Sequence, residues 1–149
     1  MKKTTGPATP WHLWAAGLIG IPWNGFGAYD YSMTMMGGEQ YLRAFGMNDA
    51  QIAYFVAMPA WVTATWAIGV WGGFLGTLLL LLRNKSALPV FIVSFAAFLL
   101  SLVYSYVLTD GAKVMDESIN MLLMNLAIAA GCVFFIWYAW KMTKRRVLR

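Results

Sequence analysis

The chain has 149 residues, of which 60% are hydrophobic and 11% charged, whereas a typical soluble domain has about 25% charged residues. This length suits one domain, and the charged residues avoid four long apolar windows, which excludes a soluble globular protein and predicts a polytopic membrane protein. The single cysteine and the single histidine, Cys132 and His12, exclude an intrachain disulfide, bis-histidine haem ligation and a histidine-based metal cluster.

The first apolar segment covers about residues 11–31, and its helical pattern extends to Met36 before Gly37 and Gly38. A cleaved signal peptide is the alternative, because two lysines precede the segment. No small-x-small cleavage site follows, and Asn24 interrupts the expected end, which favours an uncleaved span. Pro22 predicts a kink, since it removes one backbone N–H and crowds the preceding turn. Gly25 and Gly27 allow either close helix approach or local unwinding.

Helical pattern resumes before the second span. Asn48 and Gln51 have the spacing of a capping box, and we expect Pro59 to separate a surface helix over residues 49–58 from the span that follows. Glu39 and Arg43 have the i,i+4 spacing of an ion pair on a second surface turn.

The remaining spans cover about residues 59–82, 88–108 and 119–140, and each has about the 20 residues that cross a bilayer core. Ser86 and Ser118 are plausible N-caps of the last two. The second span carries two overlapping GxxxG pairs, and the first and fourth carry small-xxx-small pairs; such residues let helix backbones approach closely. We expect them to serve packing within the chain rather than an oligomer: Gly69/Gly73, Gly72/Gly76, Ala16/Gly20 and Ala127/Gly131.

Nine of the eleven lysine and arginine residues fall on one side of the four spans, and the six acidic residues fall on or near the other. The basic side of a membrane protein faces the cytoplasm. The sequence therefore predicts an all-α, antiparallel bundle of four transmembrane helices in a single domain over residues 1–149, with both termini cytoplasmic. We expect the basic tail, residues 141–149, to rest near anionic lipid headgroups.

Polar side chains from all four spans share one depth, toward the outer side. The group comprises Asn24, Thr65, Ser101, Ser105 and Asn125, with Asp30 and Tyr31 nearer the outer boundary. One interpretation is hydrogen bonding between helices, which stabilises membrane bundles by about 0.6 kcal/mol per bond on average. The other is a pocket, open to the outside, that orients a small polar ligand. The sequence favours the first interpretation and leaves the second open.

The runs WNGFGAYDYSMTMM, residues 23–36, and AYFVAMPAWVTATWAIGVWGGFLGTLLLLLR, residues 53–83, resemble a family of small, uncharacterised four-span inner-membrane proteins of proteobacteria. Its members carry WN, GA-aromatic-DY-x-MT, PAW and a glycine-containing W-G stretch. The resemblance covers roughly the first two-thirds of the chain and implies a bacterial inner-membrane location. Some members carry an automatic label of sugar transporter.

We expect a non-enzymatic integral membrane protein, an accessory or interaction component that acts through helix packing and its periplasmic face. The alternative is a transporter of a small solute, such as a sugar, or of a lipid. We expect no cofactor and no metal, since the methionines near residue 35 are more typical of apolar filling than of copper ligation. The expected partners are the lipid bilayer and other membrane subunits or a second copy. Nucleic acid is excluded because the basic residues lie at the ends of apolar segments.

Overall fold

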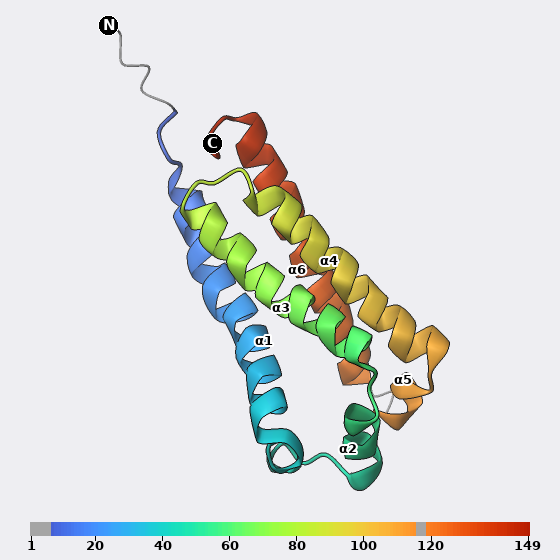
Figure 1. Ribbon diagram of the computed structural model, residues 1–149. Helices are drawn as coiled ribbons and strands as arrows, with labels where there is room; N and C mark the ends of the chain where they lie inside the picture. The colour runs from blue at the N-terminus through green and yellow to red at the C-terminus, as the bar shows by residue number, and fades with distance from the viewer. Residues whose placement is uncertain (1–6, 116–118) are drawn as a thin grey trace, which may run out of the picture.

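The computed structural model describes residues 7–115 and 119–149, without the side chains of residues 119–121 (Figure 1). Within these ranges every element is helical and no strand occurs, which confirms the all-α prediction. The elements are α1 (Trp11–Ala44), α2 (Asp49–Val56), α3 (Ala60–Leu81), α4 (Ala87–Val103), the π-helix η1 (Tyr104–Leu108), α5 (Gly111–Val114) and α6 (Ile119–Lys144).

Three segments of the described chain are helical, long and apolar enough to cross a membrane. They are α3, the continuous helix formed by α4 and η1, and residues 122–144 of α6, with mean hydropathies of 1.6, 2.3 and 2.0. Helix α1 is longer than any of them but is not in this group, because tryptophan, asparagine and glycine dilute its aliphatic residues. By length and composition, three helices of the described chain could therefore cross a membrane.

Helix α1 departs from helical backbone angles at Gly38. Gly38 has φ 51° and ψ −134°, whereas Pro22 lies inside the helix without non-helical backbone angles. That part of conformational space is open almost only to glycine. The unwinding considered around Gly25 and Gly27 does not occur. Both glycines instead serve close approach, because a Cβ atom on them would lie 3.4 Å from Phe74 and 3.3 Å from Val70 of α3.

The long helices run antiparallel and are joined at alternating ends. Helix α3 packs between α1 and α4, and α4 packs against α6. The turn over residues 82–86, the start of α1 and the C-terminus lie at one end of the bundle, here called the basic end, and α2 and α5 lie at the opposite, outer end (Figure 1). This connectivity is the hairpin arrangement that the alternating apolar and polar segments predict.

The glycines of α3 bring neighbouring helices into close contact. A Cβ atom on Gly73 would lie 2.6 Å from Oδ1 of Asn24 in α1, and one on Gly76 would lie 2.7 Å from the ring of Phe91 in α4. A Cβ atom on Gly72 would meet that of Ser94 at 3.0 Å. These glycines thus let α3 approach α1 on one face and α4 on another. The prediction that they serve packing within the chain is confirmed for Gly72, Gly73 and Gly76.

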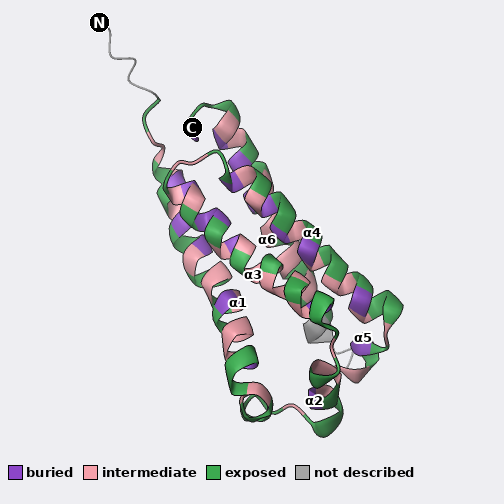
Figure 2. Ribbon diagram, viewed as in Figure 1, coloured by how far each residue is buried: buried purple, intermediate pink, exposed green. Residues whose placement is uncertain are grey.

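A cluster of buried hydrophobic residues lies at the basic end, where α1, α3, α4 and α6 meet (Figure 2). The rings of Phe91 and Phe135 stack there with centroids 5.3 Å apart. Helix α6 continues to Lys144, and the following Val147 and Leu148 are each only 3% exposed and join this cluster. Residues 141–149 therefore form the last turn of α6 and a folded-back segment.

Two backbone hydrogen bonds fix the folded-back segment to the turn between α3 and α4. The N–H of Arg149 donates to the carbonyl of Arg83 at 2.8 Å, and the N–H of Lys85 donates to the carbonyl of Arg149 at 3.0 Å. In this turn Asn84 Oδ1 accepts from the N–H of Ser86 at 2.8 Å. The predicted Ser86 cap is wrong in detail, because its side chain makes no capping bond. Ser118 lies outside the described residues.

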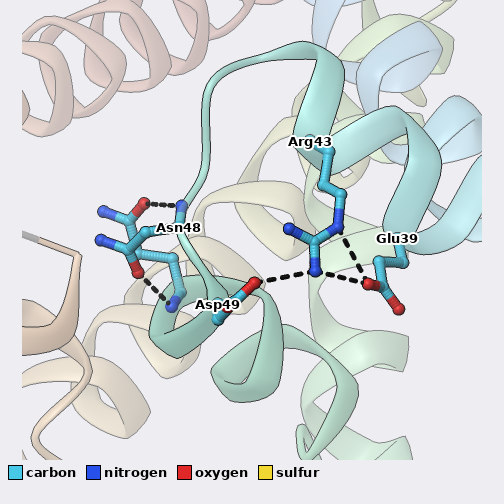
Figure 3. A network of polar contacts seen from close by, with 5 residues as sticks. Glu39, Arg43, Asn48 and Asp49 are labelled. Atoms are coloured by element: carbon cyan, nitrogen blue, oxygen red, sulfur yellow. Dashed lines mark hydrogen bonds and ion pairs between the residues drawn. The ribbon is translucent and has the colours of Figure 1, made fainter.

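The outer end is held by the predicted capping box and Glu39–Arg43 ion pair, and by one ion pair, Arg43–Asp49, that was not predicted. Asn48 and Gln51 form both hydrogen bonds of the capping box at the start of α2, with distances of 3.0 and 2.9 Å. Arg43 lies between two carboxylates, 2.7 Å from Glu39 and 2.8 Å from Asp49 (Figure 3). Pro59 separates α2 from α3 as expected. The segment after Gly38 is thereby joined to the start of α2.

Candidate functional site

The polar side chains expected at one depth divide into separate pairs along the bundle. Asn24 Nδ2 donates to Thr77 Oγ1 of α3 at 3.0 Å and to the Gly20 carbonyl of its own helix at 3.1 Å. Thr77 is fully buried and donates to the Gly73 carbonyl at 2.9 Å. Asn24 thus joins α1 to α3. Its partner Thr77 lies nearer the basic end of α3 than Thr65, the residue of α3 that was expected at the depth of Asn24.

Thr65 and Ser101 do meet, because their hydroxyl oxygens lie 3.4 Å apart between α3 and α4. Ser105 instead joins a second group at the outer end. The Tyr54 hydroxyl of α2 lies 3.3 Å from Ser105 Oγ and 3.3 Å from Thr109 Oγ1. These contacts attach the surface helix α2 to η1 and to the loop after it.

The remaining three predicted residues have partners of their own. Asp30 accepts a hydrogen bond from Tyr41, 2.9 Å away and beyond the break at Gly38. The ring of Tyr31 packs edge-on against that of Trp66, with centroids 5.0 Å apart. Asn125 Nδ2 donates to the Tyr106 hydroxyl at 3.1 Å. Among the described residues, Asn24 and Asn125 thus have different hydrogen-bond partners and no hydrogen bond joins them.

Sequence reasoning missed the partners in these pairs. Thr77, Tyr54, Thr109 and Tyr106 are not in the predicted group, and neither is Ser94, which donates to the Gly69 carbonyl of α3 at 2.6 Å. No local signal marks Thr77, because its hydroxyl bonds the carbonyl four residues back in the same way as those of Ser32, Ser101 and Thr143.

At the outer end, neighbouring groups shift the pKa values of one phenolic and two charged side chains. Partial desolvation, the hydrogen bond to Asp30 and the charge of Asp30 together raise the pKa of Tyr41 to about 12. The hydrogen bond from Lys113, 2.8 Å away, and its positive charge lower the pKa of the Asp110 carboxyl. Hydrogen bonds to Glu39 and Asp49 raise the pKa of Arg43. The outer end therefore holds its charges in pairs.

A groove of about 660 Å³ runs between α1 and α6 from the basic end toward the middle of the bundle. Helix α1 contributes one wall, with His12, Ala15, Ala16, Ile19 and Trp23. Side chains of α6 from Ala130 to Met142, together with Arg145 just after the helix, contribute the other. The two walls touch where a Cβ atom on Gly131 would lie 3.3 Å from the indole nitrogen of Trp23, and where His12 Nδ1 and the Tyr138 hydroxyl form a hydrogen bond of 2.5 Å. None of the seven predicted site residues lines this groove.

Basic side chains stand at the wide end of the groove. Lys141 and Arg145 are part of its lining, and the Lys141 ammonium lies 4.7 Å from the ring centroid of Trp137. The ion pairs of the described residues are all at the outer end, on Arg43 and Lys113. Lys141 and Arg145 therefore have no carboxylate neighbour in the described part of the chain.

The described residues contain no group of three or more histidine, cysteine, aspartate or glutamate side chains placed to hold a metal ion. The only free thiol in these ranges, Cys132, is half-buried within α6. What the arrangement provides is hydrogen bonding between helices, paired charges at the outer end and an apolar groove with a basic mouth.

Fold and composition together define the class as an all-helical protein with three helices in the described residues that are long and apolar enough to cross a membrane, which is consistent with a membrane protein. Comparison of the chain with protein-family models, with curated proteins and with solved structures finds no match.

Proposed function

We propose that the chain is a four-span protein of the bacterial inner membrane that has no enzymatic activity and works as an accessory or interaction component. It would act through the packing of its helices and through its periplasmic outer end. Both termini would lie in the cytoplasm. The resemblance of residues 23–36 and 53–83 to four-span proteobacterial proteins supports the location.

In this proposal, α1 is the fourth membrane span. From Trp11 to Gly37 this helix is about 40 Å long, enough to cross a hydrocarbon core of about 30 Å. It lies against α3 over its length and exposes apolar side chains on the other face, among them Leu18, Ile19 and Phe26. Exposure of such an apolar face to water has a high free energy, whereas its contact with lipid is favourable.

Charge distribution supports the orientation. The turn after α3 and the end of α6, which lie at the basic end, carry Arg83, Lys85, Lys141 and the four basic residues that follow it. The acidic residues Asp30, Glu39, Asp49 and Asp110 belong to the outer half of α1, to α2 and to the segment before α5, toward the outer end. Reporter fusions test this orientation. A cytoplasmic reporter should be active after residue 149 and in the turn at residues 84–85, and a periplasmic reporter should be active at residues 46–47. A periplasmic signal from the turn would refute it.

The observation that carries the accessory role is the engagement of the polar side chains in the spans with one another. Asn24 with Thr77, Thr65 with Ser101, and Asn125 with Tyr106 each form a pair. Residues that orient a solute would need donors and acceptors directed at that solute. Paired side chains instead fix helix positions, which favours a protein that works by presenting surfaces.

Extraction in a gentle detergent followed by affinity capture and native mass spectrometry tests this role. We expect the full chain to co-purify with a larger membrane complex, and the Asn24→Ala variant to be less stable without losing a specific small molecule. Recovery of a lone monomer would contradict the accessory role. A small polar solute that is retained by the wild type and lost on Asn24→Ala would contradict it in favour of transport.

A further inference from the structure

The groove between α1 and α6 has the length of one membrane leaflet. His12 and Trp23 mark its two ends on α1, and eleven residues of helix between them rise about 16 Å. Half of a hydrocarbon core of about 30 Å is about 15 Å. The groove therefore reaches from the membrane boundary at the basic end to the middle of the bilayer.

The walls of the groove suit a hydrocarbon chain. Its floor is closed by the buried side chains of Ala16, Phe135 and Met142. Its rims carry the indoles of Trp23 and Trp137, which are 47% and 48% exposed. The volume of about 660 Å³ spread over about 16 Å gives a mean cross-section of about 40 Å². A helix about 10 Å across has about twice that cross-section, so the groove fits a single flexible chain better than a partner helix.

The mouth of the groove carries positive charge without internal compensation. Lys141 lies in the last turn of α6 and Arg145 directly follows that helix, whereas the aspartate and glutamate side chains that form ion pairs lie toward the other end of the molecule. Basic pockets between membrane helices at the cytoplasmic surface bind anionic lipid headgroups. Arginine and lysine donors at this point would stand at the level of the phosphates.

We propose that this groove is a binding site for one anionic phospholipid of the leaflet at the basic end. One acyl chain lies between α1 and α6 along Ala15, Ile19 and Phe134, and the phosphate is bound by Lys141 and Arg145. The hydrogen bond between His12 and Tyr138 holds the two walls together beside the headgroup. The site depends on the membrane orientation proposed above and is independent of the accessory role.

Native mass spectrometry of the full chain tests the site. The protein is reconstituted in nanodiscs that contain equal amounts of phosphatidylglycerol and phosphatidylcholine, released in mild detergent, and its retained lipids are counted. We expect the wild type to retain one phosphatidylglycerol in preference to phosphatidylcholine. In the Lys141→Gln/Arg145→Gln variant, we expect that preference to fall about 30-fold, since each basic residue near the surface contributes about 1 kcal/mol.

Matched variants separate the site from general charge and from folding. Lys144→Gln/Arg146→Gln removes the same amount of charge near the same end of α6, but from side chains outside the groove. It should leave the preference for phosphatidylglycerol within about twofold of the wild-type value. Ala130→Phe fills the lipid-exposed side of the groove and should abolish retention, whereas Ala127→Phe, one turn beyond the groove, should not. Helix content by circular dichroism confirms that each variant is folded.

Three results would overturn the proposal. The first is equal retention of the two lipids by the wild type. The second is equal loss of phosphatidylglycerol in the two double-charge variants. The third is a second protein chain in the groove, seen by crosslinking from position 19. None of these bears on the co-purification experiment, so failure of the lipid site and failure of the accessory role are distinguishable.

Discussion

At the residue scale, Asn24 makes the contact that best explains a polar group in the middle of the long helix α1. Its amide donates to Thr77 and to the Gly20 carbonyl, so both donor positions of the side chain are used within the bundle. An amide without partners in hydrocarbon would cost several kcal/mol. The side chain therefore fixes the rotation of α1 relative to α3.

Replacement of Asn24 by alanine should lower the free energy of unfolding by about 0.6–2 kcal/mol, the range for hydrogen bonds between membrane helices. Titration with a denaturing detergent measures this loss. Thr77→Val removes the same bond from the other side, and the double variant should lose less than the sum of the two single losses. Strictly additive losses would show that the two side chains do not interact.

Tyr41 offers a test of the outer end by pH. Its pKa of about 12 lies above the ordinary value of about 10, so the neutral phenol is favoured in the folded state. The stability linked to this group is fully present below pH 10 and is lost as the pH rises toward 12. Ultraviolet titration should show one late-titrating tyrosine that disappears in Tyr41→Phe and titrates earlier in Asp30→Asn. An unchanged titration in Asp30→Asn would contradict the contact.

The sequence predicted which side chains in the spans are polar and engaged, but for most of them it did not predict the partner. Thr65 and Ser101 were found together because both lie near the outer ends of adjacent antiparallel helices. Thr77 was missed as the partner of Asn24, 53 residues away. The pairing depends on how far each helix is rotated about its axis, and that is set by glycine contacts along the whole of α3.

At the scale of elements, the glycines of α3 differ in how much space a side chain would have at their positions. A Cβ atom on Gly73 would approach Asn24 Oδ1 to 2.6 Å, whereas one on Gly69 would meet its nearest neighbour, the Ser94 carbonyl oxygen, at 3.7 Å. Gly73→Ala should therefore destabilise the bundle by about 1–3 kcal/mol through overpacking. Gly69→Ala should be neutral or slightly stabilising, because alanine favours helix. Comparison of the two variants in detergent denaturation checks this, and equal effects would contradict it.

Element boundaries followed the punctuation of the sequence closely. The Gly37–Gly38 pair ends the first part of α1, and Pro59 begins α3. The π-helix η1 was not predicted, since its apolar and aromatic residues are compatible with a regular α-helix. The Thr109 hydroxyl donates to the Tyr104 carbonyl at 2.9 Å, five residues back, and contacts Tyr54 of α2. The wider turn thus depends on a tertiary contact that no local pattern contains.

At the scale of the whole molecule, the return of residues 145–149 to the turn between α3 and α4 closes the basic end. The two buried residues of this segment were missed, because Val147 and Leu148 are a short apolar pair among five arginines and lysines. Alternation of apolar segments and charges was enough to predict the hairpins. It was not enough to predict a segment whose position depends on an open apolar surface left by four other elements.

Leu148→Ala should lower the free energy of unfolding by about 2–5 kcal/mol, the usual loss for a buried leucine. Leu82→Ala, in the adjacent turn, is the control, because Leu82 is 76% exposed and its truncation removes little packing. Thermal unfolding in detergent measures both. Similar melting temperatures for the two variants would show that the folded-back segment does not stabilise the protein.

The segregation of charge along the long axis gives the molecule an electric dipole along that axis. In the proposed orientation its positive pole faces the interior of an energised cell, which is electrically negative. A voltage of 100 mV acts on each elementary charge that crosses it with about 2.3 kcal/mol. Voltage and charge distribution then favour the same direction of insertion, so a collapsed membrane potential during synthesis would weaken the preference for one topology.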